Sequence, residues 1–428
     1  MLVWAGMSTA PVLTNLALQE RLNSARRLTD SIFARLTPEA LYSRPIPERH
    51  RLIFYLGHLE AFDWNLVCRK TLNVATFSPQ FDTLFEFGID PPVGQAASDQ
   101  PSDWPEVQDI QTYNLRVRAI IDELLDQTPE QIIQVILEHR LMHAETLAYL
   151  LHNLPYDQKT PAVTPQVYSA KPLPNPMIEI APGLATLGQK RGEFGWDNEF
   201  DEHRVHVPDF RVSKYKITNG QYLDFVRNGA CPPNFWLQRP NKTQTDWFYR
   251  GMFSEVPLPL NAPVYVTHAE ASAYARWVGK QLPTEAQFHR AAYGTPPHET
   301  SGHSERPYPW GSAEPGGSAK PGARQGNFNF HQWDPMDVDA HPTGDSAFGV
   351  SQLVGNGWEW TSTKFGPFPG FEPMSFYPGY SRNFFDEEHY VMKGGSPVTA
   401  ACMLRRSFRN WFRPNYPYVY ASFRLVED

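Results

Sequence analysis

The character of the sequence changes abruptly near residue 156, and this change constrains the fold more than any other feature. Up to Leu154, apolar residues recur at helical spacing over long stretches. A proline-rich stretch follows over residues 156–176. Beyond it, strand-like pieces are short and lie between segments rich in Gly, Pro, Asn and Trp. The sequence therefore predicts an α+β protein, with a helical domain over 12–155, a semi-rigid linker over 156–176, and a loop-rich domain over 177–428.

The first domain carries four stretches with helical periodicity. They span residues 13–36, 51–72, 104–125 and 128–154. An up-down four-helix bundle is the economical arrangement for four amphipathic helices. The connection over residues 73–103 is long for a compact domain. Its apolar residues predict that it packs on the bundle rather than remaining disordered; they are Phe81, Leu84, Phe85, Phe87 and Ile89.

Capping residues predict where several helices begin and end. In the bundle, Thr128 is the expected N-cap of the fourth helix, with Pro129 at its first position, and Ser102 and Asp103 are candidate caps of the third. In the second domain, helices are expected over 218–228, 267–278 and 284–293, and strands over 177–180 and 203–207. The expected signals there are Thr218 as a cap, Gly279 as a stop, and a capping box from Thr284 to Gln287.

The fourth helix contains a histidine pair, His139 and His143, four residues apart. This spacing places both imidazoles on one face of the helix, where they can reach one metal ion. Glu145 points to another side. Such a pair by itself more often packs in a core or on a surface than binds a metal, so a third ligand is needed.

His58, in the second helix, is the candidate for that third ligand. The alternative role for His58 is that of a packed core histidine. Cofactor sites in helix bundles, however, are built from inward residues on facing helices. Three histidine ligands would leave open positions on the metal, as catalytic sites require. Three neutral histidine ligands suit Fe(II) or Zn(II), and the spacing of the histidines does not distinguish between these two metals.

Bulk properties exclude several classes of function. The 428-residue chain has a net charge of −8 and a pI near 6.0, so it has no electrostatic footprint for nucleic acid. No apolar run reaches the length of a membrane span, and no signal peptide is evident, although Met7 is an alternative start. Three scattered cysteines indicate a reducing compartment, so a cytoplasmic enzyme without nucleic-acid or membrane partners is expected.

Six ordered segments of the second domain resemble the formylglycine-generating-enzyme, or sulfatase-modifying-factor, fold family. The segments are residues 194–199 (FGWDNE), 215–222 (YKITNGQY), 281–288 (QLPTEAQF), 354–361 (VGNGWEWT), 393–396 (KGGS) and 422–425 (SFRL). The resemblance implies a C-type-lectin-like α+β fold. That fold hosts several activities, and the cysteine pair of the formylglycine enzymes is absent, because only Cys402 follows the KGGS segment. A formylglycine-type copper oxidase is therefore disfavoured.

The first domain, with His58 and the HxxxHxE pattern at 139–145, looks like a DinB-type bundle. A DinB-like bundle followed by this second domain resembles the sulfoxide synthases of ergothioneine biosynthesis and the related selenoneine synthases. The resemblance implies a mononuclear non-haem Fe(II) enzyme with O₂ as co-substrate, which joins sulfur or selenium to imidazole C2 of hercynine. It implies His58, His139 and His143 as the metal ligands.

The resemblance also implies residues that bind the substrates. Asn410 and Trp411 match the family's Asn-Trp pair that holds the betaine end of hercynine, and aromatic rings attract a trimethylammonium group. The family's proton-donating tyrosine, in the loop before the KGGS segment, corresponds to Tyr377 or Tyr380, and the sequence does not choose between them.

Two departures from the family bear on the chalcogen donor. The branch that uses γ-glutamylcysteine has an Asp directly after the Asn-Trp pair and an Arg four residues later, where this chain has Phe412 and Tyr416. These two residues cannot form the charge-assisted hydrogen bonds that a charged dipeptide needs. The crossover, which is the long connection over residues 73–103, also departs from the family. It has Leu-Phe-Glu-Phe-Gly-Ile-Asp over 84–90, where another branch of the family has paired tyrosines. Cysteine or a selenosugar is the expected donor. The alternative from another class is a non-catalytic ligand-binding protein with a structural metal in the bundle.

Overall fold

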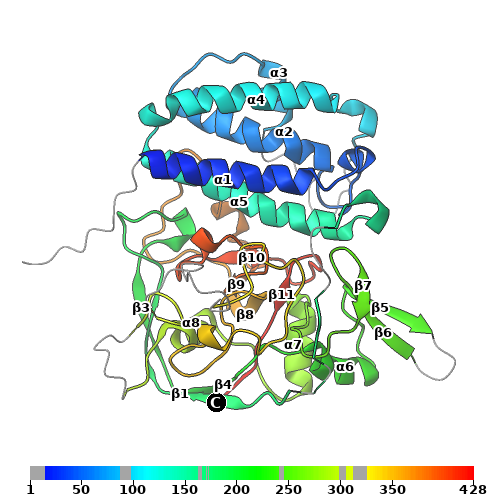
Figure 1. Cartoon of the computed structure of the whole chain (residues 1–428). Coiled ribbons are helices and arrows are strands. Elements are labelled where there is room, and N and C mark those ends of the chain that lie inside the picture. Colours follow the sequence, from blue (N-terminus) through cyan, green and yellow to red (C-terminus); the bar gives the residue numbers. More distant parts are fainter. Residues whose placement is uncertain are drawn as a thin grey trace, which may run out of the picture. The chain divides into compact units, whose positions relative to one another are not determined.

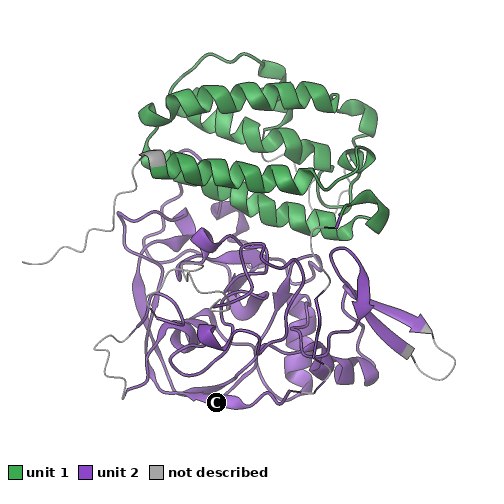
Figure 2. Cartoon of the chain, viewed as in Figure 1, with its two compact units in different colours: residues 1–160 green, residues 161–428 purple. Residues whose placement is uncertain are grey.

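The computed structural model describes residues 15–86, 98–161, 166–169, 171, 173–240, 245–297, 305–311 and 325–428. The chain divides into two compact units, residues 1–160 and 161–428 (Figure 2). The first is helical, and the second combines helices with small sheets, so the expected α+β fold is confirmed. Met7, Phe87, Ile89 and the start of the predicted helix 13–36 lie outside the described residues.

Four helices of at least twelve residues form the described core of the first unit (Figure 1). They are α1 (Asn15–Phe33), α2 (Leu52–Asp63), α4 (Val107–Leu124) and α5 (Glu130–Asn153). Helix α5 packs on α1 and on α2, and α2 packs on α4. The predicted bundle is thus confirmed, with one difference: the second predicted helix changes to a π-helix, η2 (Trp64–Thr71), after Asp63.

The predicted N-cap of α5 is wrong. The helix begins at Glu130, and Pro129 is its N-cap with an extended ψ of 138°. Thr128 precedes a proline and is itself extended, because the proline ring disfavours helical backbone at the preceding residue. Its hydroxyl donates instead to the carbonyl of Leu124 at 2.9 Å.

The predicted caps of the third helix are also wrong, for a related reason. Ser102 and Asp103 belong to a separate 3-10 turn, η3 (Pro101–Asp103). Trp104 is then extended before Pro105, so the helix starts only after Glu106.

The crossover between α2 and α4 packs on the bundle, as expected, through the described apolar residues that the sequence singled out. Its helix α3 (Pro79–Leu84) contacts α2, Phe85 is fully buried, and Phe81 and Leu84 are half-buried. The remaining short helical turns of this unit are η1 (Glu39–Tyr42), η4 (Leu125–Gln127) and η5 (Tyr156–Gln158).

The second unit contains α6 (Asn219–Arg227), α7 (His268–Trp277) and α8 (Glu285–Tyr293). Their predicted signals are confirmed: Thr218 caps α6, Thr284 and Gln287 form a capping box on α8, and Gly279 follows α7 with a φ of 70°. The 3-10 turns of this unit are η6 (Asp197–Glu199), η7 (Pro342–Gly344), η8 (Arg382–Phe384) and η9 (Ala401–Met403).

The described strands of this unit form small sheets. Their orders are β1-β4-β12, β10-β9-β8-β11, β2-β3 and β5-β6-β7. Neighbours pair antiparallel, except that β11 runs parallel to β8. The strands are β1 (Met177–Ile180), β2 (Gly183–Leu187), β3 (His203–Val207), β4 (Phe210–Ser213), β5 (Trp236–Pro240), β6 (Thr245–Arg250), β7 (Glu255–Pro257), β8 (Trp358–Lys364), β9 (Tyr390–Lys393), β10 (Asn410–Phe412), β11 (Ala421–Ser422) and β12 (Val426–Glu427).

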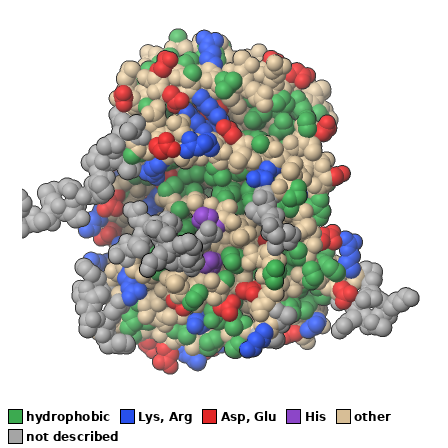
Figure 3. Space-filling view, in the orientation of Figure 1, with side chains coloured by type: hydrophobic (Ala, Val, Ile, Leu, Met, Phe, Trp, Pro, Cys, Tyr) green, Lys and Arg blue, Asp and Glu red, His purple; other side chains and the backbone are tan. Residues whose placement is uncertain are grey.

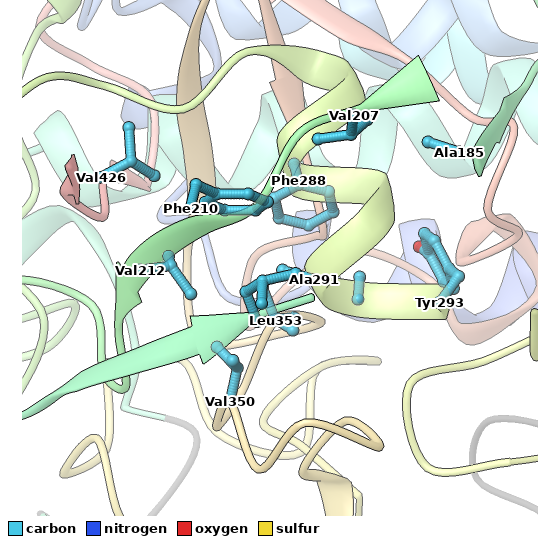
Figure 4. Close-up of a cluster of buried hydrophobic side chains, with 12 residues drawn as sticks. Ala185, Val207, Phe210, Val212, Phe288, Ala291, Tyr293, Val350, Leu353 and Val426 are labelled. Atoms are coloured by element: carbon cyan, nitrogen blue, oxygen red, sulfur yellow. The ribbon is translucent and has the colours of Figure 1, made fainter. Parts of the chain in front are cut away.

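A core of buried apolar side chains lies where α8 packs against strands of the second unit (Figure 4). Phe288 and Ala291 of α8 meet Val207, Phe210 and Val212 of β3 and β4 there. Burial of this kind, rather than long regular elements, stabilises a unit with such short strands.

Both charge signs occur on the face of each unit that Figure 3 shows. Among the described residues, no helix combines the length and the apolar character that a membrane crossing needs. The three cysteines form no disulfide with one another; Cys68 is buried, and Cys231 and Cys402 are exposed.

Candidate functional site

The structure brings together the three histidines that the sequence singled out. His58 lies on α2, and His139 and His143 lie one turn apart on α5, which packs against α2. One nitrogen from each ring lies within 4.8 Å of the other two, and Nε2 of His58 is 3.3 Å from Nε2 of His143. Metal–nitrogen bonds of about 2.0–2.1 Å place two ligands of one ion roughly 3–4 Å apart. The cluster therefore has dimensions that suit a single metal ion.

The ring of His58 is oriented by a backbone carbonyl. Its Nδ1 lies 2.8 Å from the carbonyl oxygen of Phe85. A carbonyl can only accept, so Nδ1 carries the proton and Nε2 of the neutral ring is left with a lone pair. The face of the ring stacks on Phe54, with centroids 4.8 Å apart. His58 thus directs its Nε2 toward His143.

The other two imidazoles are held in the neutral form. Burial, followed by the neighbouring histidines, lowers the pKa of His139 and of His143 well below the usual value. Nδ1 of each is buried without a hydrogen-bond partner among the described residues. His139 also stacks on Phe62, with centroids 3.4 Å apart. Together with Nε2 of His58, these two neutral imidazoles form a donor set that fits a divalent metal ion.

A buried ion cluster joins α2 to α5 beside these histidines. Arg140, the residue after His139, is fully buried and donates to both oxygens of Glu60, at 3.0 and 2.7 Å, and to Asp63 at 2.7 Å. Arg118 of α4 donates to Glu60 as well, at 2.8 Å. The cluster therefore ties three helices together at the level of the histidines.

The two carboxyl groups of this cluster differ in their ionisation. Burial would raise the pKa of Glu60, but Arg140 and Arg118 outweigh it and hold that pKa below its usual value. Burial raises the pKa of Asp63 to about 6 although Arg140 is close, and the charge on Glu60 adds to the rise. Arg140 therefore chiefly compensates Glu60.

Glu145 lies apart from the cluster, as the sequence suggested, and His152 is not part of it either. Glu145 is buried and accepts a hydrogen bond from the hydroxyl of Tyr149. His152 is buried in the last turn of α5.

In the second unit, Trp411 lies among other aromatic rings. It sits on β10, opposite Val391 of β9, and stacks on Phe365 with centroids 4.1 Å apart and planes 7° apart. Tyr380 meets it nearly at a right angle, with centroids 5.5 Å apart, and stacks in turn on Trp196 at 4.0 Å. The structure thus brings together two residues that the sequence linked to substrate, Trp411 and Tyr380.

The remaining predicted residues of this unit have separate surroundings. Tyr377 contacts the ring of Tyr380 at 5.5 Å between centroids. Asn410 accepts a hydrogen bond at Oδ1 from the backbone N–H of Trp411 at 2.9 Å. Phe412 stacks on Tyr416, with centroids 5.0 Å and planes 13° apart. Phe412 and Tyr416 therefore form an aromatic pair beside the Asn-Trp pair.

The FGWDNE segment fixes the loop that carries both tyrosines. Asp197 binds the Ser381 hydroxyl and accepts at 3.4 Å from the backbone N–H of Met374. Asn198 donates to the same hydroxyl at 2.9 Å. The loop over 374–381 is thus held at both ends.

The same segment also fixes the stretch that leads to Asn410. Glu199 binds Arg405 and accepts from the Ser407 hydroxyl at 2.7 Å. Arg409 is buried and donates to the carbonyl of Asn198 at 3.2 Å. One segment therefore sets the positions of the tyrosine loop and of Trp411 relative to each other.

Other recognisable segments meet in a second buried ion cluster. Glu359 of the VGNGWEWT segment accepts from Lys216 of YKITNGQY at 2.7 Å and from Arg424 of SFRL at 2.9 Å. All three are buried, and burial lowers the pKa of Lys216 to about 8. The charged residues of these segments therefore hold the fold together.

Sequence reasoning missed the backbone group that orients His58 and the buried ion cluster beside the histidines. The carbonyl of Phe85 leaves no trace in a pattern of side chains. Arg140, Glu60 and Asp63 left a signal that could have been read: charged residues within stretches that are otherwise apolar enough to be buried on all sides.

Each of the two units matches the model of a known protein family. Residues 164–428 match the model of the sulfatase-modifying factor enzyme 1-like domain, and residues 21–152 match that of the DinB superfamily. Together these matches cover both units.

Curated relatives match more than half of this chain. The chain is 30% identical to ergothioneine biosynthesis protein 1 of Neurospora crassa, over 92% of this chain and 55% of that protein. It is 36% identical to hercynine oxygenase of Mycobacterium tuberculosis, over 54% of this chain and 56% of that protein. With hercynine oxygenase of Mycolicibacterium thermoresistibile it shares 32% identity over 73% of each chain. The chain spans about half the length of the first two relatives.

Proposed function

The chain belongs to the sulfoxide synthase family of ergothioneine biosynthesis, and we propose that it is a mononuclear non-haem iron enzyme acting on hercynine. With O₂ as the oxidant, the C2–H bond of the imidazole is replaced by a C–S or C–Se bond. The observation that carries the proposal is the cluster of His58, His139 and His143, with one nitrogen of each within 4.8 Å of the others.

The three histidines hold the metal and leave its other positions to the substrates. Bound iron supplies the site for O₂ and a positive charge that favours a deprotonated sulfur or selenium. His58 offers Nε2, because its Nδ1 proton is donated to the carbonyl of Phe85. Since these ligands carry no charge of their own, they would leave the charge of a bound ion uncompensated.

The betaine end of hercynine is held by Asn410 and Trp411. The indole face of Trp411 attracts the trimethylammonium group. The amide oxygen of Asn410 accepts from the backbone of Trp411, which directs its Nδ2 group to donate to the carboxylate. Tyr380 contacts Trp411, so we favour it over Tyr377 as the residue that delivers a proton.

The donor is cysteine or a selenosugar rather than γ-glutamylcysteine. The support is the stacked pair of Phe412 and Tyr416, which offers rings where a charged dipeptide needs carboxylate and guanidinium partners. A neutral or small donor loses no charge-assisted bonds there.

Oxygen uptake tests the reaction. The protein is reconstituted anaerobically with Fe(II), and O₂ consumption is followed with hercynine and each donor in turn. We expect uptake that needs both hercynine and a donor. If metal is bound but no O₂ uptake depends on hercynine and a donor, the proposal fails, and a ligand-binding protein with a structural metal is favoured instead.

A competition experiment tests the donor. Cysteine, γ-glutamylcysteine and a selenosugar are offered together, and the products are identified by mass spectrometry. The double variant Phe412→Asp with Tyr416→Arg should increase the share of γ-glutamylcysteine product. A wild-type preference for γ-glutamylcysteine would reject the donor assignment but not the reaction.

A further inference from the structure

The contact between His58 and the Phe85 carbonyl depends on a segment outside the helices that carry the histidines. Phe85 follows α3, and its backbone N–H donates to the carbonyl of Phe81 at 3.0 Å. Its carbonyl then reaches Nδ1 of His58 at 2.8 Å, 27 positions away in the chain. The interactions that hold α3 in place therefore also determine which nitrogen of the His58 ring carries the proton.

The ring of Phe85 lies directly on the backbone of α2. A Cβ atom added to Gly57 would stand 2.6 Å from three atoms of that ring, a distance at which the ring must move. The ring is fully buried, with Trp104 on a nearly parallel plane and a centroid 6.2 Å away. Gly57 therefore permits the close approach that brings the carbonyl to His58, the next residue on α2.

A buried carboxylate anchors the helix that leads to Phe85. Asp82 is fully buried and accepts from the indole of Trp64 at 2.9 Å, from the hydroxyl of Tyr113 at 2.9 Å, and from the hydroxyl of Thr76. Its own carbonyl accepts from the Asn65 side chain at 3.0 Å. These donors come from η2, from α4 and from the crossover, so Asp82 ties α3 to the bundle on several sides.

We propose that α3 is a positioning element for the candidate metal centre, in which Gly57 and Asp82 hold the Phe85 carbonyl against Nδ1 of His58. The carbonyl keeps His58 in the tautomer whose Nε2 can bind a metal. Groups that orient a ligand histidine in this way typically contribute 10–100-fold to metal affinity. The inference rests on the proposed metal role of the histidines but not on the reaction.

The metal-free protein gives the first test. Proton–nitrogen correlation spectra of protein labelled with ¹⁵N-histidine report which ring nitrogen carries the proton. We expect His58, assigned with His58→Gln, to be protonated at Nδ1. Protonation at Nε2 instead would overturn the proposal, whatever the enzyme activity.

Metal binding to variants gives the second test. Gly57→Ala inserts a methyl group under the Phe85 ring, and Asp82→Asn places an amide donor among groups that donate. Each should weaken Co(II) affinity by about 10–100-fold, alter the visible Co(II) spectrum and remove the Nδ1–H signature of His58. Ala61→Gly, on the same helix, is the matched control and should retain all three properties.

The outcomes separate this inference from the proposed function. Wild-type Co(II) affinity in both variants would overturn it, and so would unfolding of both variants by circular dichroism, because α3 would then support the bundle rather than position the ligand. If the expected Co(II) results appear but no hercynine-dependent O₂ uptake occurs, the inference stands and the proposed reaction fails.

Discussion

Arg140 and Glu60 form a doubly hydrogen-bonded pair inside the bundle, with distances of 3.0 and 2.7 Å and neither side chain more than 1% exposed. The pair stands beside the candidate metal centre, because Arg140 follows His139 and Glu60 is two residues after His58. The ion pair and the candidate metal ligands are therefore carried by the same two helices.

Replacing Arg140 by Met should destabilise the first unit strongly. The substitution leaves Glu60 and Asp63 buried with less compensation, and breaking such a pair costs about 3–5 kcal/mol. Urea unfolding followed by circular dichroism measures the loss. Arg27→Met, which removes an exposed pair with Glu20, is the control and should have little effect.

Asp63 should make a contribution to stability that falls as pH rises. Its pKa is raised from 3.8 to about 6 in the folded protein, so the folded state binds a proton more tightly than the unfolded chain between these values. The stabilisation is present below pH 3.8 and is lost as pH rises through about 6. Asp63→Asn should therefore cost more at pH 4.5 than at pH 7, by on the order of 1–3 kcal/mol. Unfolding free energies of both proteins at the two pH values measure the difference; an equal cost at both would contradict the shift.

Removing one histidine of the cluster should abolish tight metal binding. His139→Ala deletes one of three ligands, so metal analysis after purification should show loss of bound iron. Added Fe(II) should raise the melting temperature of the wild type, because a ligand at 100 times its Kd stabilises by about 2.7 kcal/mol, and should leave the variant unchanged. His206→Ala, at an exposed position of β3, is the control. Unchanged iron content in His139→Ala would show that the ligand assignment is wrong.

The two tyrosines should differ in their effect on turnover. Tyr380→Phe removes the hydroxyl of the tyrosine whose ring contacts Trp411, and loss of a positioned proton donor typically lowers a rate by about 10²–10⁴-fold. Tyr377→Phe should have a much smaller effect. Single-turnover rates with hercynine and donor distinguish them, and the reverse order would transfer the role to Tyr377.

Trp411 should affect the binding of hercynine and not of the donor. Trp411→Leu removes a cation–π contact worth about 0.5–2 kcal/mol, which corresponds to roughly a 2–30-fold rise in KM for hercynine. Trp411→Phe keeps an aromatic face and should recover part of the loss. Trp277→Leu, 45% exposed on α7, should leave both KM values unchanged. An effect on the KM of the donor alone would argue against the assigned role.

Sequence patterns succeeded where the determining interactions are local. The capping box from Thr284 to Gln287 joins residues three apart, and the stop at Gly279 needs only a positive φ. They failed at Thr128, because Pro129 has an extended ψ and the helix begins one residue later, and at Asp103, because Trp104 is extended before Pro105.

The sequence by itself determined that His139 and His143 share a face of one helix, because the pitch of the α-helix fixes residues four apart. Only the tertiary structure decided that Nε2 of His58 lies 3.3 Å from His143, that the Phe85 carbonyl orients His58, and that Tyr380 meets Trp411. Those contacts join residues 27 to 85 positions apart, and they depend on how buried side chains fill the space between helices and loops. Helical pitch can be read along a chain, whereas the packing of side chains from distant segments cannot.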